Sequence, residues 1–438
     1  MHKNDKSNSV SSFENNEFLS AQTLANRAKR ASSLISRSSS SARTRALHRL
    51  SSELRSPERQ KTIFQANQID CQAAEIAGIG SALLDRLRID RSRLDALAAS
   101  VAEVADLIDP IGAIEDLVIR PSGLQVGRMW VPLGVILMIY ESRPNVTIDA
   151  GALCIKTGNA VILRGGKEAR NTNAAFVELL QSVLDESNLP KDSVLFAETQ
   201  EHSFLNALLK QQGLIDVAIP RGGENLIRAV MEHSCVPVIQ HFKGVCHVYV
   251  EQSADLTMAE KIIVNAKTSR PGVCNALEGI VVDDAIAPTF LPRIVETLSG
   301  LGVEIRGCPR SLIHLAGKSH PNLKAANDDD FDREFLDLTC SLATVAGMDE
   351  ALEFISRHGS KHTESIITQN YEHGLRFLRE VDASCVLVNA STRFNDGGEL
   401  GLGAELGIST SKLHAYGPMG LRELCARKFV VFGHGEVR

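Results

Sequence analysis

The pattern of apolar and polar residues changes along the chain. Residues 20–108 combine charged faces with Leu, Ile and Ala at helical spacing, as in residues 83–107. Residues 116–128 then alternate apolar and polar positions around Pro121-Ser122-Gly123, which is typical of two strands joined by a tight turn. The sequence therefore predicts a helical N-terminal part followed by a β-hairpin.

Short apolar runs alternate with helical segments in the next part of the chain. The runs cover residues 135–140, 160–163, 194–197, 215–219 and 246–250. This alternation predicts an open α/β domain, in which a parallel sheet is connected by crossover helices. A second α/β block is expected from residue 256 to about residue 384, and a last strand-like run, residues 428–432, is expected to pair with another element or subunit.

The N-terminal residues differ in character from the rest. Residues 1–19 are rich in Asn, Ser, Glu and Lys, and they contain no apolar run, so we expect a disordered tail there. Residues 27–45 are rich in Arg and Ser and lack acids, as a transit sequence would. Apolar residues nevertheless recur at helical spacing from Leu24 to Ile35, which favours an ordinary first helix.

Composition narrows the classes of function. A chain of 438 residues, 44% of them hydrophobic, is too long to fold around a single hydrophobic core of ordinary size, so at least two domains are expected. The formal net charge of -6 provides no basic surface for a nucleic acid. The longest apolar stretch, residues 131–140, is about half of the roughly 20 residues that a membrane helix needs. Nine cysteines without a CxxC pair fit a reducing compartment. We therefore expect a cytoplasmic protein that binds neither nucleic acid nor membrane.

The turns after the predicted strands are candidate ligand sites, because ligands bind at the carboxyl ends of strands in open α/β sheets. Three of these turns read Glu141-Ser142-Arg143-Pro144-Asn145, Arg164-Gly165-Gly166-Lys167 and Pro220-Arg221-Gly222-Gly223-Glu224. The last two offer backbone amides, a helix N-terminus and a guanidinium to a phosphate group. The chain has no GxGxxG and no GxxxxGK[ST] motif, so a dinucleotide would bind by another arrangement. Ordinary surface turns are the alternative.

Cys274 is the candidate nucleophile. It comes after Pro271-Gly272, and we expect this turn to deliver the cysteine to the start of a helix. A helix N-terminus and a nearby arginine would favour the thiolate form of the side chain. The alternative is a buried cysteine that caps the helix.

A group of histidines and cysteines between residues 233 and 247 could suggest metal ligands. Its members are His233, Cys235, His241, Cys246 and His247. Their spacing matches no common zinc pattern, so no metal is expected.

Together these motifs resemble the aldehyde dehydrogenase superfamily, and within it the γ-glutamyl phosphate reductase family of proline biosynthesis. The similarity extends from about residue 20 to the C-terminus, through residues 132–135, 140–147, 158–166, 270–276 and 417–421. The resemblance implies an aldehyde dehydrogenase-like α/β fold of two parallel-sheet domains plus a small β oligomerisation element. It also explains why the chain has no GxGxxG motif, because this superfamily binds its nicotinamide cofactor without one.

The resemblance also implies a division into domains. The cofactor-binding domain would comprise residues 20–115 and 135–254, and the catalytic domain residues 255–390. Residues 116–134 and 391–438 would form the oligomerisation element and the C-terminal segment, so a homo-oligomer is expected.

The resemblance assigns roles to individual residues. Cys274 would be the nucleophile, Asn145 an oxyanion-hole donor, and Glu334 the group that holds the nicotinamide ribose. From charge and turn position, we expect Arg143 to anchor the anionic substrate. The cofactor-binding residues of the turns would be Arg164, Gly165, Gly166, Lys167, Gly222 and Gly223. Arg164 and Lys167 would bind the adenosine 2′-phosphate of NADPH, and for all three cations a solvated surface position is the alternative.

The implied reaction is the NADPH-dependent reduction of L-glutamyl 5-phosphate to L-glutamate 5-semialdehyde, with release of phosphate, through a thioester on Cys274. No residue around positions 240–246 matches the superfamily's deacylating glutamate, which fits a reductive direction without thioester hydrolysis. A separate glutamate 5-kinase would supply the acyl phosphate. The alternatives are an oxidising, NAD-dependent aldehyde dehydrogenase and a non-catalytic binding module.

Four residues depart from the pattern of the family. They are Phe242, Lys243, Gly279, where the family has threonine, and Tyr416, where it has arginine.

Overall fold

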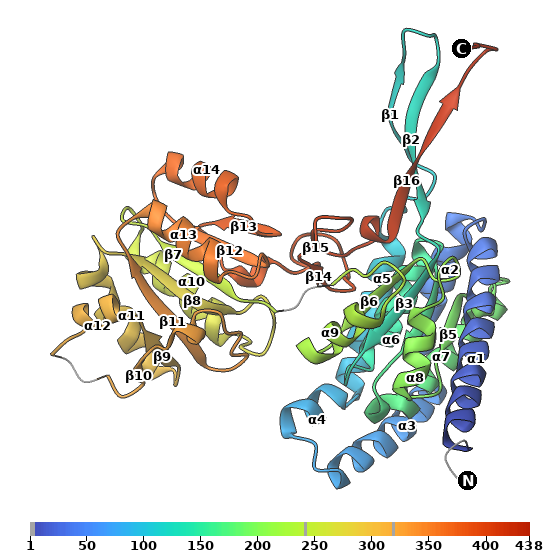
Figure 1. Cartoon of the computed structure of the whole chain (residues 1–438), viewed down its shortest axis with the longest axis horizontal. Helices are drawn as coiled ribbons and strands as arrows, with labels where there is room; N and C mark the ends of the chain where they lie inside the picture. The colour runs from blue at the N-terminus through green and yellow to red at the C-terminus, as the bar shows by residue number, and fades with distance from the viewer. Residues whose placement is uncertain (1–4, 241–242, 318–319) are drawn as a thin grey trace. The chain divides into compact units, whose positions relative to one another are not determined.

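The computed structural model describes residues 5–240, 243–317 and 320–438, which fall into two units (Figure 1). Unit 1 comprises Met1–Gln240, Gly401–Gly407 and Met419–Arg438. Unit 2 comprises His241–Leu400 and Ile408–Pro418. Each unit contains its own parallel sheet.

Helices form the N-terminal part of unit 1, as the sequence predicted. They are α1 (Asp5–Ile35), α2 (Ser40–Leu54), α3 (Pro57–Ile76), α4 (Ser81–Leu87) and α5 (Arg91–Asp106). Side-chain oxygens of Ser39, Ser56 and Asp90 cap α2, α3 and α5, because each accepts a hydrogen bond from the backbone N–H three residues further on.

The disordered tail that we expected for residues 1–19 is wrong for residues 5–19, which belong to α1. Residues 1–4 lie outside the described part of the chain. Ala21, Ala25 and Ala28 anchor α1 in the core of unit 1. Once these turns are fixed, each further residue gains a backbone hydrogen bond without a new nucleation cost, so the helix extends into polar sequence.

The sheet of unit 1 has four parallel strands in the order β5-β4-β3-β6. The strands are β3 (Val135–Tyr140), β4 (Ala160–Arg164), β5 (Val194–Phe196) and β6 (Val217–Arg221). The helices that come after them are α6 (Asn145–Lys156), α7 (Arg170–Glu186), α8 (His202–Leu209) and α9 (Glu224–His233). Every residue of β3 and β4 is buried, which explains why their sequences are continuous apolar runs.

Unit 2 has a seven-stranded parallel sheet in the order β10-β9-β11-β8-β7-β12-β13. The strands are β7 (Cys246–Val250), β8 (Leu277–Asp283), β9 (Glu304–Gly307), β10 (Leu323–Ala325), β11 (Thr339–Val345), β12 (Thr363–Ile367) and β13 (Cys385–Val388). The helices are α10 (Leu256–Thr268), α11 (Ala287–Gly300), α12 (Pro309–His314), α13 (Met348–His358) and α14 (Tyr371–Glu380).

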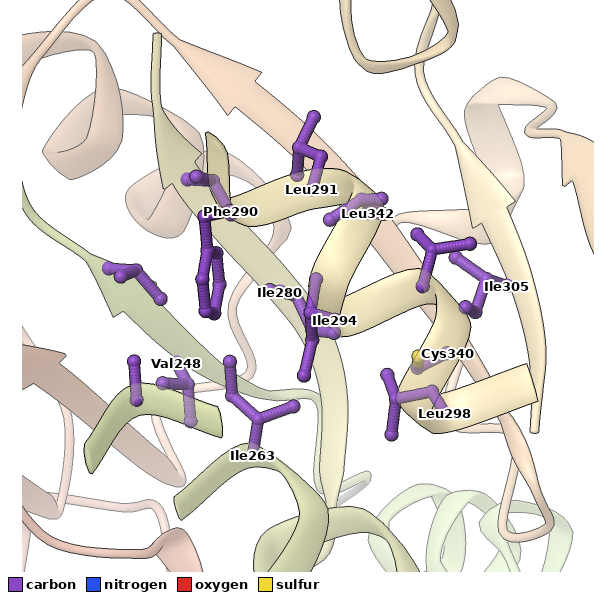
Figure 2. Close-up of a cluster of buried hydrophobic side chains, with 14 of the residues drawn as sticks. Val248, Ile263, Ile280, Phe290, Leu291, Ile294, Leu298, Ile305, Cys340 and Leu342 are labelled. Atoms are coloured by element: carbon purple, nitrogen blue, oxygen red, sulfur yellow. The ribbon is translucent and has the colours of Figure 1, made fainter. Parts of the chain in front are cut away.

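One hydrophobic core of unit 2 lies between α11 and this sheet. Phe290, Ile294 and Leu298 of α11 pack in one buried cluster with Ile280 of β8 and Leu342 of β11 (Figure 2). The first of these two strands begins directly after the turn of the candidate nucleophile, so the cluster fixes the strand on which that turn rests.

The position of β7 corrects our prediction. We expected residues 246–250 in the first sheet and a domain boundary after residue 254, but β7 pairs with β8 and β12 of unit 2, and the units divide after Gln240. An apolar run identifies a buried strand, whereas the sheet it joins depends on partners that are distant in sequence.

A three-stranded antiparallel sheet completes unit 1 and confirms the predicted hairpin. It consists of β1 (Ile114–Ile119), β2 (Gln125–Pro132) and β16 (Cys425–Phe432), and Figure 1 shows it extending away from the helices of unit 1. β16 pairs with β2 from Cys425 opposite Pro132 to Phe432 opposite Gln125, so the last strand-like run does pair with another element. Several apolar side chains of this sheet are exposed, including Ile119, Phe429 and Val431.

A short two-stranded sheet of β14 (Ile408–Ser409) and β15 (Gly417–Pro418) belongs to unit 2. No helix in the described ranges has the length and apolarity that crossing a membrane requires.

Candidate active site

Cys274 lies at the amino end of β8. α10 ends at Thr268, the turn that contains Cys274 comes next, and β8 begins at Leu277. The helix that we expected after Cys274 is therefore wrong, and with it the expectation that a helix N-terminus favours the thiolate. Pro-Gly turns precede helices and strands alike, and the branched apolar residues Ile280, Val281 and Val282 fit a buried strand. The side chain of Cys274 is half-buried and forms no disulfide.

The backbone of Cys274 is held from several sides. Gly244 lies so close that a Cβ there would come within 2.9 Å of the Cys274 Cα, and closer to its carbonyl oxygen. The Cys246 thiol donates to the Cys274 carbonyl at 3.2 Å. The Thr392 hydroxyl donates to the Asn275 carbonyl at 2.7 Å, and the Asn275 carboxamide donates to a backbone carbonyl of the same segment. A nucleophile on such a support is positioned before substrate binds.

A buried histidine–carboxylate pair lies beside β8, where His247 is opposite Gly279. His247 Nδ1 is 3.0 Å from a carboxylate oxygen of Glu364, and both side chains are fully buried. Burial raises the pKa of Glu364, although the charge of His247 and its hydrogen bonds oppose the shift. Gly279 makes room for the imidazole, because a Cβ there would lie 3.0 Å from His247 Nε2. At position 279, where this chain departs from the family pattern, the glycine therefore leaves the space that the imidazole of His247 fills.

A second buried pair connects the turn of Cys274 to the segment of Glu334. Lys267 Nζ lies 2.9 Å from a Glu278 carboxylate oxygen and donates to the Leu277 carbonyl at 2.8 Å. The other Glu278 oxygen accepts from the Leu336 amide at 3.3 Å. Burial raises the pKa of Glu278 to about 7, against the charge of Lys267. Leu336 adopts a φ of 58°, which branched or bulky residues rarely adopt, so Glu278 supports a strained turn two residues after Glu334.

In unit 1, three turns meet at the carboxyl edge of the sheet. The Glu141 carboxylate, after β3, accepts from the Gly223 amide after β6 at 2.9 Å. The Glu168 carboxylate, after β4, accepts from the amide and hydroxyl of Ser142 at 2.6 and 2.7 Å. Gly222 is needed for this arrangement, because a Cβ there would lie 2.7 Å from the Glu141 carboxyl carbon. These turns are therefore connected to one another by carboxylates, which sequence reasoning missed.

The first Arg-Gly-Gly turn is largely buried. The Arg164 guanidinium is only 7% exposed and donates to the Gln200 carbonyl at 2.9 Å. Burial lowers the pKa of Arg164, and the charges of Glu168 and Glu141 oppose that effect. Gly165 and Gly166 are buried as well, whereas Lys167 is exposed. The alternative that Arg164 is a solvated surface residue is therefore wrong. Lys167, in contrast, does lie at the solvated surface.

Asn145 and Arg143 lie in the turn that connects β3 to α6. Asn145 is the first residue of α6, is exposed, and donates through Nδ2 to an Asp149 carboxylate oxygen at 3.0 Å. Burial raises the pKa of Asp149 to about 6, against the hydrogen bond from Asn145 and the charge of Arg221. Arg143 is half-buried. The spacing of four residues between Asn145 and Asp149 was the signal in the sequence that could have identified this pair.

The remaining departures from the family pattern have local partners. Lys243 Nζ donates to the Asp332 carbonyl at 2.7 Å, and the Tyr416 hydroxyl donates to Asp382 at 3.0 Å. Phe242 lies outside the described residues, as does His241 of the histidine and cysteine group.

Comparison with known proteins agrees with this architecture. A family model described as "Aldehyde dehydrogenase family" matches residues 6–306. A gamma-glutamyl phosphate reductase of Solidesulfovibrio magneticus is 52% identical over 417 residues, which are 95% of this chain and 98% of that protein. The protein of the same name from Caldanaerobacter subterraneus subsp. tengcongensis is 48% identical over 420 residues, 96% of this chain and 100% of that one.

A solved structure gives the same answer for the fold. The crystal structure of gamma-glutamyl phosphate reductase from Thermotoga maritima has a TM-score of 0.91 and 41% identity, and the match covers 96% of this chain and 100% of that one. The predicted aldehyde dehydrogenase-like fold is confirmed. The chain belongs to the aldehyde dehydrogenase family and, within it, to the gamma-glutamyl phosphate reductases.

Proposed function

We propose that this oxidoreductase reduces L-glutamyl 5-phosphate to L-glutamate 5-semialdehyde with release of phosphate, in the second step of proline biosynthesis. Relatives with 52% and 48% identity over nearly the whole chain carry the name of that activity. The structural observation that carries the proposal is the half-buried thiol of Cys274, on a turn whose backbone is fixed by Gly244, Cys246 and Thr392.

The proposed chemistry begins at Cys274. Its thiolate attacks the γ-carbonyl carbon, a C–S bond forms, and the C–O bond to phosphate breaks. Phosphate leaves with the electron pair, and a thioester remains on the sulfur. The Cys274 backbone amide and the Asn145 carboxamide donate to the oxyanion of each tetrahedral intermediate. After reduction, collapse of the thiohemiacetal regenerates the thiol and releases the aldehyde.

The nicotinamide cofactor, NADPH in our proposal, supplies the hydride for this reduction when it is bound. The residues of unit 1 fit such a group in part. α9 begins after Gly223, which is exposed and has no side chain to cap the helix, so the first amides of α9 can approach a pyrophosphate. The exposed Lys167 is the better of the two candidates for the 2′-phosphate, since Arg164 is buried. In unit 2, Glu334 would hold the nicotinamide ribose.

The remaining roles are assigned from charge and exposure. Arg143 would anchor the anionic substrate from the turn after β3. A separate glutamate 5-kinase would deliver the acyl phosphate in the cytoplasm. The three-stranded sheet of β1, β2 and β16 would mediate assembly into a homo-oligomer, because it exposes apolar side chains such as Phe429 and Val431.

The test is the reverse reaction, the reduction of NADP+ by glutamate 5-semialdehyde with and without phosphate. We expect the wild type to require phosphate and Cys274→Ala to be inactive. Cys235→Ala is the matched control, because it makes the same change at an exposed cysteine and should retain the wild-type rate. Oxidation that proceeds equally well without phosphate would refute the reductase and favour an ordinary aldehyde dehydrogenase.

A further inference from the structure

Asp149 lies one helical turn after Asn145 on the same face of α6. Its carboxylate accepts from the Asn145 carboxamide, with 3.0 Å between Nδ2 and Oδ2. The side chain of Asp149 is half-buried, and burial raises its pKa to about 6. A carboxylate kept in a partly desolvated position next to a functional group is more common at active sites than in ordinary helices.

Arg221 stabilises this carboxylate from another part of unit 1. It is the last residue of β6, and its charge favours the ionised form of Asp149. Its side chain lies against Gly407, where a Cβ would come within 2.9 Å of the guanidinium carbon. Gly407 has a φ of 140°, in the region that favours glycine. Three segments that are distant in sequence therefore converge behind Asn145.

The geometry restricts the carboxamide of Asn145. An ionised carboxylate only accepts hydrogen bonds, so it selects Nδ2 and rejects Oδ1 on its side of the amide. Once one N–H is bound to Asp149, the plane of the carboxamide and the direction of its second N–H are fixed. A donor oriented before the reaction stabilises an oxyanion without reorganisation at the moment of reaction.

We propose that Asp149, supported by Arg221 seated on Gly407, is a positioning residue that orients the Asn145 carboxamide as an oxyanion donor. This inference rests on the proposed function, which assigns the oxyanion role to Asn145. Asp149 itself touches neither substrate nor cofactor in this proposal, and it acts through Asn145.

A double-mutant cycle tests the proposal. The kcat and KM of the phosphate-dependent reaction are measured for Asp149→Asn, Asp149→Ala, Asn145→Ala and the double variant Asn145→Ala/Asp149→Ala. We expect the Asp149 variants to lose about 10- to 100-fold in kcat, as for a lost hydrogen bond to a charged group, with KM for the cofactor nearly unchanged. The double variant should be no slower than Asn145→Ala, because without the carboxamide there is nothing to orient.

Asp185→Asn is the matched control, because it makes the same change at an exposed position of α7 and should keep the wild-type kcat. The inference is overturned if Asp149→Asn keeps the wild-type kcat, if the two losses multiply in the double variant, or if Asn145→Ala is fully active.

A readout independent of activity separates the inference from the proposed function. Loss of the partly buried charge in Asp149→Asn should raise the Tm at pH 8, whereas a purely structural carboxylate would give a lower Tm and overturn the inference. A wild type without any phosphate-dependent reaction refutes the proposed function, whereas an active wild type whose Asp149→Asn variant keeps the wild-type kcat overturns the inference alone.

Discussion

The backbone of Gly244 lies close to the backbone of Cys274, the candidate nucleophile. We therefore predict that Gly244→Ala lowers the rate of catalysis more than it lowers the stability of the fold. A Cβ on Gly244 would lie 2.9 Å from the Cys274 Cα, whereas ordinary contact begins at 3.4 Å. The Cys274 backbone must therefore move by about half an ångström or more, because its neighbour is backbone rather than a flexible side chain. Since a displacement of about 1 Å can cost about 10²-fold in rate, we expect kcat to fall about 10- to 100-fold.

The assay for Gly244→Ala is the phosphate-dependent reduction of NADP+, together with thermal unfolding. Overpacking of this kind costs about 1–3 kcal/mol, so the variant should still fold, and KM for the cofactor should change little. Gly300→Ala is the control, because a Cβ at the end of α11 meets nothing within 4 Å. A Gly244→Ala variant with wild-type kcat would show that the turn of Cys274 adapts freely and that its fixed backbone is irrelevant.

Buried charges and exposed apolar residues lead to three further predictions. Lys267→Met should destabilise the protein by about 3–5 kcal/mol in denaturant unfolding, because it leaves the carboxylate of Glu278 buried without its cation. The double variant Lys267→Met/Glu278→Leu should recover part of that lost stability. The folded pKa of Asp149, about 6, lies above its usual value of 3.8, so the wild type loses stability as pH rises through that interval and Asp149→Asn does not. The free energy of unfolding of this variant, relative to the wild type, should therefore increase by about 2 kcal/mol between pH 4 and pH 7, and a difference that is constant with pH would contradict the reasoning. Phe429→Asp with Val431→Asp should reduce the molar mass measured by light scattering, and an unchanged mass would exclude this sheet as the assembly surface.

The sequence was most informative where structure is local. β3 and β4 were predicted because a strand buried on both faces must be continuously apolar, and the hairpin of β1 and β2 because its turn contains proline and glycine. The element after Cys274 was misjudged, because a Pro-Gly turn leads into a helix or a strand with equal ease. The sheet of β7 was misjudged because its partners, β8 and β12, are contributed by distant residues.

In the candidate site, too, local motifs were predictable from the sequence and contacts between distant residues were not. Cys274, Asn145 and the glycine turns were identified from the sequence, since their residue types and neighbours form recognisable motifs. The groups that hold them could not be identified in this way. Glu141 contacts Gly223 across 82 positions, and Glu278 contacts Leu336 across 58, so these hydrogen bonds exist only after the chain has folded.

The pairing of β2 with β16 has a consequence for biosynthesis. β2 lies between β1 and β16, but β16 is synthesised roughly 300 residues later. At a translation rate of about 5–20 residues per second, the open edge of β2 waits roughly 15–60 s for its partner. An unpaired edge with apolar neighbours can pair with other nascent chains, so this stretch is where we expect the growing polypeptide to depend on chaperones.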